Sequence, residues 1–209
     1  MRAYYSRMGT TSKVVSVMRT LAEIADVRMG YPFRSRVRHD ISGDVTVIQM
    51  KDIDDANLLH VNGAIKTALP GAKAHHLLRK GDLLFRSRGR SNGAGMVTAG
   101  IGPAVLAAPM LLIRPHPDAV LPAYLGWLIN APDTQAQLAA MAEGTSVRMI
   151  STLALKNLEL PLPDMKRQRQ IVEAAILSNR EQALMAAIAF QRQRLITNIL
   201  MQFAHKADQ

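Results

Sequence analysis

The sequence predicts an α+β protein, in which a mixed domain of short strands and helices precedes one long C-terminal helix. Between Gly30 and Pro115, short apolar runs alternate with turn residues, as is typical of strands joined by tight turns. Two proline-initiated helical patterns follow within residues 122–142. From residue 164 to Phe203 neither Gly nor Pro occurs, which favours one uninterrupted helix. A chain of 209 residues has room for one such domain and an appendage.

We expect the first twenty residues to be a flexible N-terminal extension. They contain Arg and Ser but no acidic residue, and their apolar patch at residues 14–18 is too short for the core of a signal peptide. No apolar run approaches the ~20 residues needed to span a bilayer. The absence of cysteine excludes disulfides and fits a reducing compartment, so we expect a cytoplasmic protein without membrane contact.

The elements of the mixed domain are expected to be short. Leu21–Val27 has the pattern of a helix, with Gly30 as its stop. Strands are expected at Asp44–Met50, Gly81–Arg86, Gly95–Thr98 and Ala108–Arg114. Helices are expected at Pro122–Asn130, Pro132–Ala142 and Ser151–Asn157, the last followed by a strand at Leu158–Leu160. The expected organisation is a mixed domain at 21–162, the long helix at 163–205 and a tail at 206–209.

The long helix carries an apolar stripe. Pro163 can open it, because an amide in the first turn has no intrahelical partner. At 1.5 Å per residue, roughly 40 residues make a rod of about 60 Å. Apolar residues recur at helical steps at Ile171, Ala175, Leu184, Ile188, Leu195 and Ile199. The stripe needs another helix to cover it, which predicts pairing as a coiled coil. The alternative is that the helix folds back on its own domain.

The chain is strongly basic. Its formal net charge is +10 and its pI is near 10.4, while a hydrophobic content of 48% is sufficient for a core. Such a charge favours a polyanionic partner, with nucleic acid as the first candidate. The alternative is a basic protein without an anionic partner.

One basic segment follows a predicted strand directly and is the first candidate for contact with nucleic acid. It contributes Arg86, Ser87, Arg88, Arg90 and Asn92. If the strand continues, its period of two places the three guanidinium groups on one face. Arginine suits both phosphate contact and bidentate contact to guanine. The alternative is a solvated basic hairpin.

Two further segments are candidates for the same role. They contribute Arg34, Arg36 and Arg38, and Thr145, Ser146 and Arg148. The three arginines occupy alternate positions after Tyr31 and Phe33. The second set follows Gly144 in a predicted loop. The alternative for both is an irregular surface loop.

Other polar groups favour ordinary structural roles. His75 and His76 lack a further ligand at metal-binding spacing, and the carboxylates of residues 52–55 fit a solvated turn. We expect Gln168 on the solvent-exposed face of the long helix. The sequence contains no Gly-x-x-x-x-Gly-Lys phosphate loop and no evident pairing of a nucleophile with a base. It therefore predicts a binding module rather than an enzyme, without a metal or a cofactor.

Six segments carry a resemblance to a known family by their order and spacing. They are Leu21–Tyr31, Val47–Ile53, Gly81–Gly89, Leu121–Leu125, Gly144–Ile150 and, most specific, Leu160–Asp164 with Gln168 and Ile171 after it. Across residues 21–205 this order resembles a target-recognition domain and its conserved helix in the DNA-specificity (S) subunits of type I restriction-modification systems.

The resemblance implies a non-catalytic subunit that directs an adenine-specific DNA methyltransferase subunit to double-stranded DNA. A restriction nuclease subunit is a further implied partner. Standard subunits of this family carry two recognition domains and two helical regions, and this chain has one of each. The resemblance therefore implies a half-subunit that forms a homodimer and binds a bipartite target. The alternative is a stand-alone dimeric nucleic-acid-binding regulator or scaffold.

Overall fold

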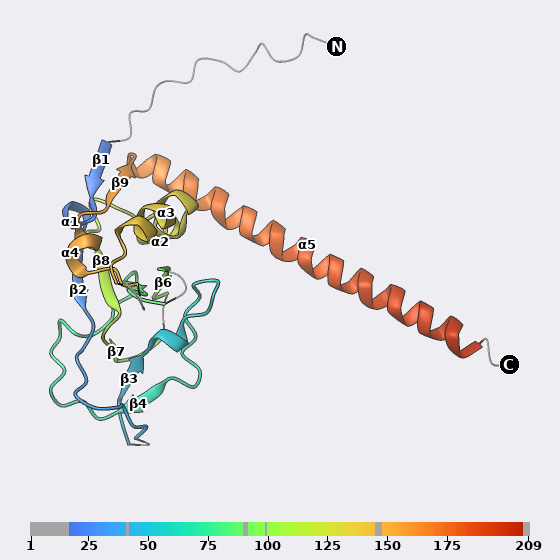
Figure 1. Ribbon diagram of the computed structural model, residues 1–209, viewed down its shortest axis with the longest axis horizontal. Coiled ribbons are helices and arrows are strands. Elements are labelled where there is room, and N and C mark those ends of the chain that lie inside the picture. The colour runs from blue at the N-terminus through green and yellow to red at the C-terminus, as the bar shows by residue number, and fades with distance from the viewer. Residues whose placement is uncertain (1–16, 41, 90–91, 99, 145–147, 207–209) are drawn as a thin grey trace, which may run out of the picture. The chain divides into compact units, whose positions relative to one another are not determined.

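The computed structural model of this protein describes residues 17–40, 42–89, 92–98, 100–144 and 148–206. The chain divides into two compact units, residues 1–169 and 170–209. The first unit is a mixed α+β domain, and the second consists of most of helix α5 (Met165–Lys206) (Figure 1). The predicted fold class and the long C-terminal helix are confirmed. In the described part of the chain, no helix combines the length and apolar character that crossing a membrane requires.

The domain contains nine short strands, four helices and one turn of 3-10 helix among its described residues. In chain order these are β1 (Val17–Thr20), α1 (Leu21–Ile24), β2 (Ala25–Met29), β3 (Val45–Ile48), η1 (Met50–Asp52), β4 (Ile65–Thr67), β5 (Leu83–Phe85), β6 (Ala94–Met96), β7 (Ala104–Leu106), β8 (Leu111–Pro115), α2 (Pro122–Asn130), α3 (Pro132–Met141), α4 (Thr152–Lys156) and β9 (Glu159–Leu162).

The strands form three small sheets. A four-stranded antiparallel sheet has the order β2-β8-β5-β6, and a three-stranded sheet has the order β4-β3-β7, with β3 and β7 parallel. The third sheet is the antiparallel pair β1–β9. Most pairs join segments far apart in sequence, so the domain depends on long-range contacts.

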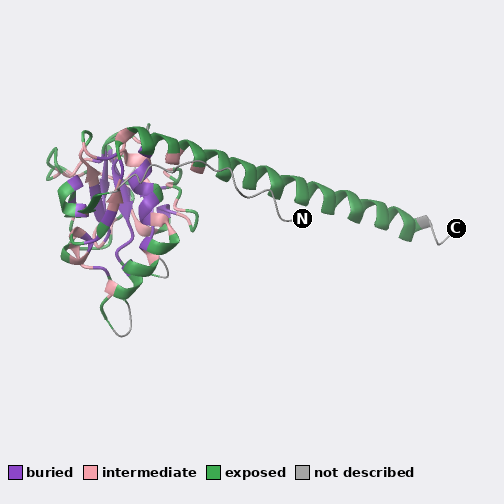
Figure 2. Ribbon diagram, turned by 90° about the horizontal axis from the view of Figure 1, so that it is seen from above, coloured by how far each residue is buried: buried purple, intermediate pink, exposed green. Residues whose placement is uncertain are grey.

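Two clusters of buried side chains lie on opposite faces of the three-stranded sheet. In β3, Ile48 belongs to a buried cluster with Leu84 and Leu112 of the four-stranded sheet, whereas Val45 and Val47 belong to a second cluster. This division follows from the alternation of side chains along a strand. Helix α2 packs against the four-stranded sheet, where a Cβ at its Gly126 would lie 3.3 Å from the Leu83 side chain. Figure 2 shows the buried residues concentrated in this domain.

Several local predictions are confirmed. Helix α2 has the predicted bounds, with Pro122 in its first turn. Ser151 caps α4, because its hydroxyl accepts a hydrogen bond from the Ala154 amide at 3.1 Å. Gly81 and Asp82, which begin the predicted strand Gly81–Arg86, lie just before β5: Gly81 has φ +90°, and the buried Asp82 carboxylate accepts two bonds from Arg114 at 2.8 and 2.7 Å. These bonds raise the pKa of Arg114 above its ordinary value.

The structure departs from the prediction at both ends of the domain. Residues 1–16 of the expected extension lie outside the described residues, but Val17–Thr20 form β1 because they pair with β9. The expected helix Leu21–Val27 ends at Ile24, since the following residues pair with β8. Strands β4 and β7 were not predicted. Each is three residues long and is defined by its partners rather than by a local pattern.

The expectation for Gln168 is wrong. It was expected on the solvent-exposed face of the helix, but Gln168 is only 1% exposed. Its Oε1 accepts a bond from the Leu121 amide at 2.8 Å, and its Nε2 donates to the Pro163 carbonyl at 2.9 Å. Gln168 thus satisfies the first free amide at the start of α2 and ties it to the first turn of α5.

Helix α5 spans 42 residues, or about 63 Å at 1.5 Å per residue. Leu184, Ile188, Leu195 and Ile199 are 57%, 58%, 60% and 42% exposed. On a straight helix of ~100° per residue they fall within about 60° of one another. Ile171 and Ala175, predicted on the same stripe, lie at least ~80° from each of these residues around such a helix and are half-buried. The exposed stripe therefore runs along the later turns.

Candidate nucleic-acid interface

The first basic segment does not form the single arginine face that strand alternation predicted. Strand β5 ends at Phe85, and the Arg86 amide donates to the Gly93 carbonyl at 2.9 Å, which closes a hairpin. Arg86 is 7% exposed and Ser87 is 2% exposed, with the Ser87 hydroxyl bonded to the Pro109 carbonyl at 2.6 Å. Arg88 is exposed. Arg90 lies outside the described residues.

Arg86 has a structural environment. Its Nη2 donates to Asn57 Oδ1 at 2.6 Å, while its Nε finds no partner among the described residues. Asn57 has φ 62°, in the left-handed region that Asn tolerates better than most residues. A buried guanidinium with one polar partner is costly. Arg86 is thus a buried residue of the domain, at the start of the hairpin that carries Arg88.

The structure brings the first and third basic segments together. Arg88 forms an antiparallel bridge with Met149, and the Ile150 amide donates to the Ser87 carbonyl at 2.7 Å. Arg148 is exposed, and its Nη2 lies 3.2 Å from the Ala142 carbonyl. Thr145 and Ser146 lie outside the described residues. Two exposed arginines, 60 positions apart in sequence, thus come from adjacent segments.

A shallow cavity marks this junction. Its volume is about 360 Å³, and it is lined by Arg88, Glu143, Gly144, Met149 and Ser151. One cation and one carboxylate therefore border it. Arg88 is the positively charged group at its border that could meet an anionic ligand.

The second basic segment lies along a separate groove. Arg34, Arg36 and Arg38 are all exposed, whereas Phe33 and Val37 pack against the cluster on β3. All three arginines are thus exposed without a strand, but Ser35 between them is exposed too, so burial does not alternate here. The groove has a volume of about 690 Å³ and is lined by Phe33, Ser35, Arg36, Val37, Arg38, Asp40, Thr67, Ala68 and Leu69.

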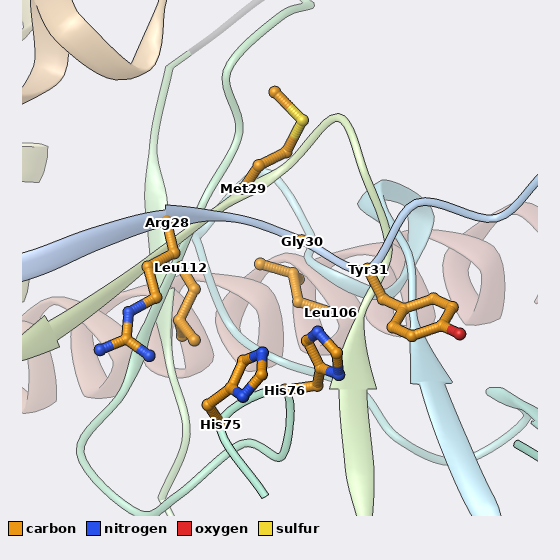
Figure 3. Close-up of a pocket in the computed structure, with 8 residues that line it drawn as sticks. All are labelled: Arg28, Met29, Gly30, Tyr31, His75, His76, Leu106 and Leu112. Carbon is orange, nitrogen blue, oxygen red and sulfur yellow. The ribbon is translucent and has the colours of Figure 1, made fainter. Parts of the chain in front are cut away.

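A smaller pocket of about 230 Å³ lies beside His75 and His76 (Figure 3). The two imidazole rings are 4.0 Å apart between centroids, and Nδ1 of His76 accepts from the Lys73 amide at 3.0 Å. Burial lowers the pKa of His76. Arg28 also lines the pocket, but it is paired with Asp26 at 2.9 Å. Within the described residues, no group of three or more side chains is arranged to hold a metal ion.

Sequence reasoning missed three amides around the first segment. Asn57, Asn130 and Gln135 each bond to the Arg86–Ala94 hairpin. Asn92, which was predicted as a contact in the loop tip, donates through Nδ2 to the Arg86 carbonyl at 3.0 Å. In the sequence, only the two glycines at 93 and 95 pointed to these contacts. They indicate that another group packs closely against the hairpin, but not which residue supplies it.

The chain thus combines a basic α+β domain, with exposed arginines in its loops, and a long C-terminal helix. The sequence profile of the type I restriction modification DNA specificity domain matches residues 14–197. The chain therefore belongs to this family. No curated protein sequence matches it significantly.

Solved structures show the same fold. The HsdS subunit from Thermoanaerobacter tengcongensis is 19% identical, with a TM-score of 0.60 over 87% of this chain and 40% of that one. The S subunit of the type I restriction-modification system from M. genitalium is 15% identical, with a TM-score of 0.53 over 89% of this chain and 45% of that one. A chain from a study of type I R-M complex assembly and conformational transition is 19% identical, with a TM-score of 0.61 over 87% and 42%. This chain thus spans less than half the length of the structures it matches.

Proposed function

We propose that this protein is a non-catalytic, sequence-specific DNA-binding subunit that directs a DNA adenine methyltransferase to its target. The observation that carries the proposal is the family match over residues 14–197, which covers both the domain and most of the helix. A restriction nuclease subunit is a further proposed partner of the same complex.

The proposed DNA surface begins at the junction of the first and third segments. Arg88 and Arg148 are its exposed cations, with Arg90, Asn92, Thr145 and Ser146 in the same stretches of chain. Arginine can contact phosphate or guanine at such a surface. The burial of Arg86 and Ser87 argues against a direct DNA contact by either. Arg34, Arg36 and Arg38 form a second proposed surface.

The subunit is proposed to act as a homodimer through α5. The stripe of exposed apolar side chains supports this, because a lone helix cannot cover its own apolar face. A symmetric pair is the commonest oligomer, and an antiparallel arrangement would separate two identical recognition domains. Two-fold symmetry of the protein would then map onto a bipartite palindromic target with an unread spacer.

Sequencing of genomic adenine methylation tests the proposal. Deleting the gene should abolish methylation at one bipartite palindromic motif, and restoring it should bring that motif back. Inserting seven residues near the middle of α5 adds two turns, about 10.5 Å. The spacer should then change by roughly three base pairs at ~3.4 Å each, with unchanged half-sites.

Each part of the proposal can fail separately. A contiguous, asymmetric motif would refute symmetric pairing. Methylation unaffected by deletion would refute the link to a methyltransferase and would favour the stand-alone regulator. Methyl transfer by the purified chain with S-adenosylmethionine would refute the non-catalytic assignment.

A further inference from the structure

We infer that Asn130 and Gln135 are positioning residues that hold the Arg86–Ala94 hairpin in the conformation needed for DNA sequence recognition. The inference rests on the proposed DNA-binding function. It assigns a role to side chains that themselves lie outside the basic segments, on α2 and α3.

The returning leg of the hairpin comprises residues 92–94. Asn130 forms hydrogen bonds with both backbone groups of Ala94 in this leg. Its Oδ1 accepts from the Ala94 amide at 2.9 Å, and its Nδ2 donates to the Ala94 carbonyl at 2.9 Å. These are the two bonds that a neighbouring β-strand would supply to the edge strand β6. Here a single amide side chain replaces that strand.

Gln135 fixes the same leg one step nearer to the tip. Its Nε2 donates to the Asn92 carbonyl at 3.2 Å and to the Ile129 carbonyl at 2.7 Å. The Ile129 bond anchors Gln135 to the end of α2, which also supplies Asn130. The position of the returning leg is therefore set by the end of α2 rather than by another loop.

The hairpin is also confined on its other side. A Cβ at Gly93 would lie only 2.0 Å from Asn57 Oδ1, and one at Gly95 would lie 3.1 Å from the Asn57 carbonyl. Asn57 is in turn held by Arg86. Glycine is needed at residue 93 because the amide of Asn57 occupies the space of a side chain.

Both legs of the hairpin are thus fixed by hydrogen bonds, and those on the outgoing leg lie next to Arg88. The outgoing leg comprises residues 86–88. In it, the Ser87 hydroxyl donates to the Pro109 carbonyl, and the Ser87 carbonyl accepts from the Ile150 amide. Base recognition needs donor positions accurate to about 0.5 Å, and a loop that must order on binding loses affinity. Hydrogen bonds at the two legs meet this requirement for Arg88, the exposed arginine next to them.

Asn130→Asp is the sharpest test. It keeps the size of the side chain and the acceptor for the Ala94 amide, but it replaces the donor to the Ala94 carbonyl with a second oxygen. Asn62→Asp is the matched control, because Asn62 is exposed and the substitution introduces the same charge. Leu138→Ala is the stability control, because Leu138 is fully buried in α3.

The measurement is binding of the full-length protein to a duplex carrying the methylated motif and to a scrambled duplex, well below the unfolding temperature. Asn130→Asp should lower the ratio of the two affinities by about tenfold, the effect of roughly one lost hydrogen bond. Gln135→Ala should lower the same ratio less. Asn62→Asp and Leu138→Ala should keep the parental ratio, although Leu138→Ala unfolds at a lower temperature.

The outcomes separate the inference from the function on which it rests. A parental protein that discriminates between the duplexes, with unchanged ratios in Asn130→Asp and Gln135→Ala, overturns the inference alone. Equal loss in Leu138→Ala also overturns it, because general loosening would then explain the effect. A parental protein without discrimination refutes the proposed function and the inference together. Should Asn130→Asp fail to fold, the Gln135→Ala ratio decides.

Discussion

The domain and the long helix differ in where their side chains find partners. Among the described residues of the domain, buried polar side chains find internal partners, as Asp82 does with Arg114 and Gln168 with Leu121, and only the Nε of Arg86 lacks one. In α5, large apolar side chains such as Leu184 and Leu195 are 57% and 60% exposed. Figure 2 shows the contrast between a purple interior and a green helix. The domain buries most of its large apolar side chains internally, whereas the helix leaves many of its own exposed.

This contrast predicts where substitutions act. Changes in the domain should alter folding or DNA recognition within one chain. Changes on the stripe of α5 should leave the domain folded and alter assembly. If substitutions in either region had the effects expected of the other, this contrast between the domain and the helix would be wrong.

The largest effect is expected from Leu184→Asp with Ile188→Asp. Each Asp would place an unpaired charge in the helix pair, at a cost of several kcal/mol. Light scattering should give a dimer for the parent and a monomer for the double variant. The matched control is Gln182→Asp with Ala186→Asp, which has the same spacing and charge on the opposite side of the helix. It should remain dimeric.

A monomeric parent at micromolar concentration would contradict homodimerisation through α5. Dissociation of the control to the same extent would assign the effect to the loss of helix propensity rather than to the stripe. Dimeric behaviour of both double variants would move the interface elsewhere on the molecule.

The sequence was informative where structure is set by local signals. Helix α2 was predicted with its bounds because Pro122 marks the first turn. The long helix was predicted because Gly and Pro are absent over 40 residues. Both signals lie within a few residues of the element that they specify.

The sequence was uninformative where structure depends on distant partners. Arg86, Arg88 and Arg90 alternate like residues of a strand, yet β5 ends at Phe85, and Arg86 is buried against Asn57 while Arg88 is exposed. The Asn130 clamp joins residues 36 positions apart. Local alternation cannot distinguish an exposed arginine from one that a distant amide buries.

The second prediction concerns Gln168, which the sequence placed on the wrong side of the helix. Gln168→Ala removes the acceptor of the Leu121 amide and the donor to the Pro163 carbonyl. Leaving such buried groups unpaired costs about 1–3 kcal/mol. Chemical denaturation of the domain should show this loss. Gln170→Ala, at an exposed position two residues later, should change the unfolding free energy by less than ~0.5 kcal/mol. Equal stability of the two variants would contradict the buried role.

The last prediction separates two arginines that are neighbours in sequence but differ in burial. Arg86→Ala leaves Asn57 Oδ1 without its bond and should lower the unfolding free energy by about 1–3 kcal/mol. Arg88→Ala removes an exposed side chain and should change it by less than ~0.5 kcal/mol. If Arg88 contacts a phosphate, its removal should weaken binding to all duplexes and reduce the salt slope by about one unit. If it contacts a base, the loss should be about 1–3 kcal/mol and confined to the cognate duplex. Titrations of the full-length protein at several salt concentrations distinguish these cases. Unchanged affinity of Arg88→Ala for every duplex would remove Arg88 from the DNA surface.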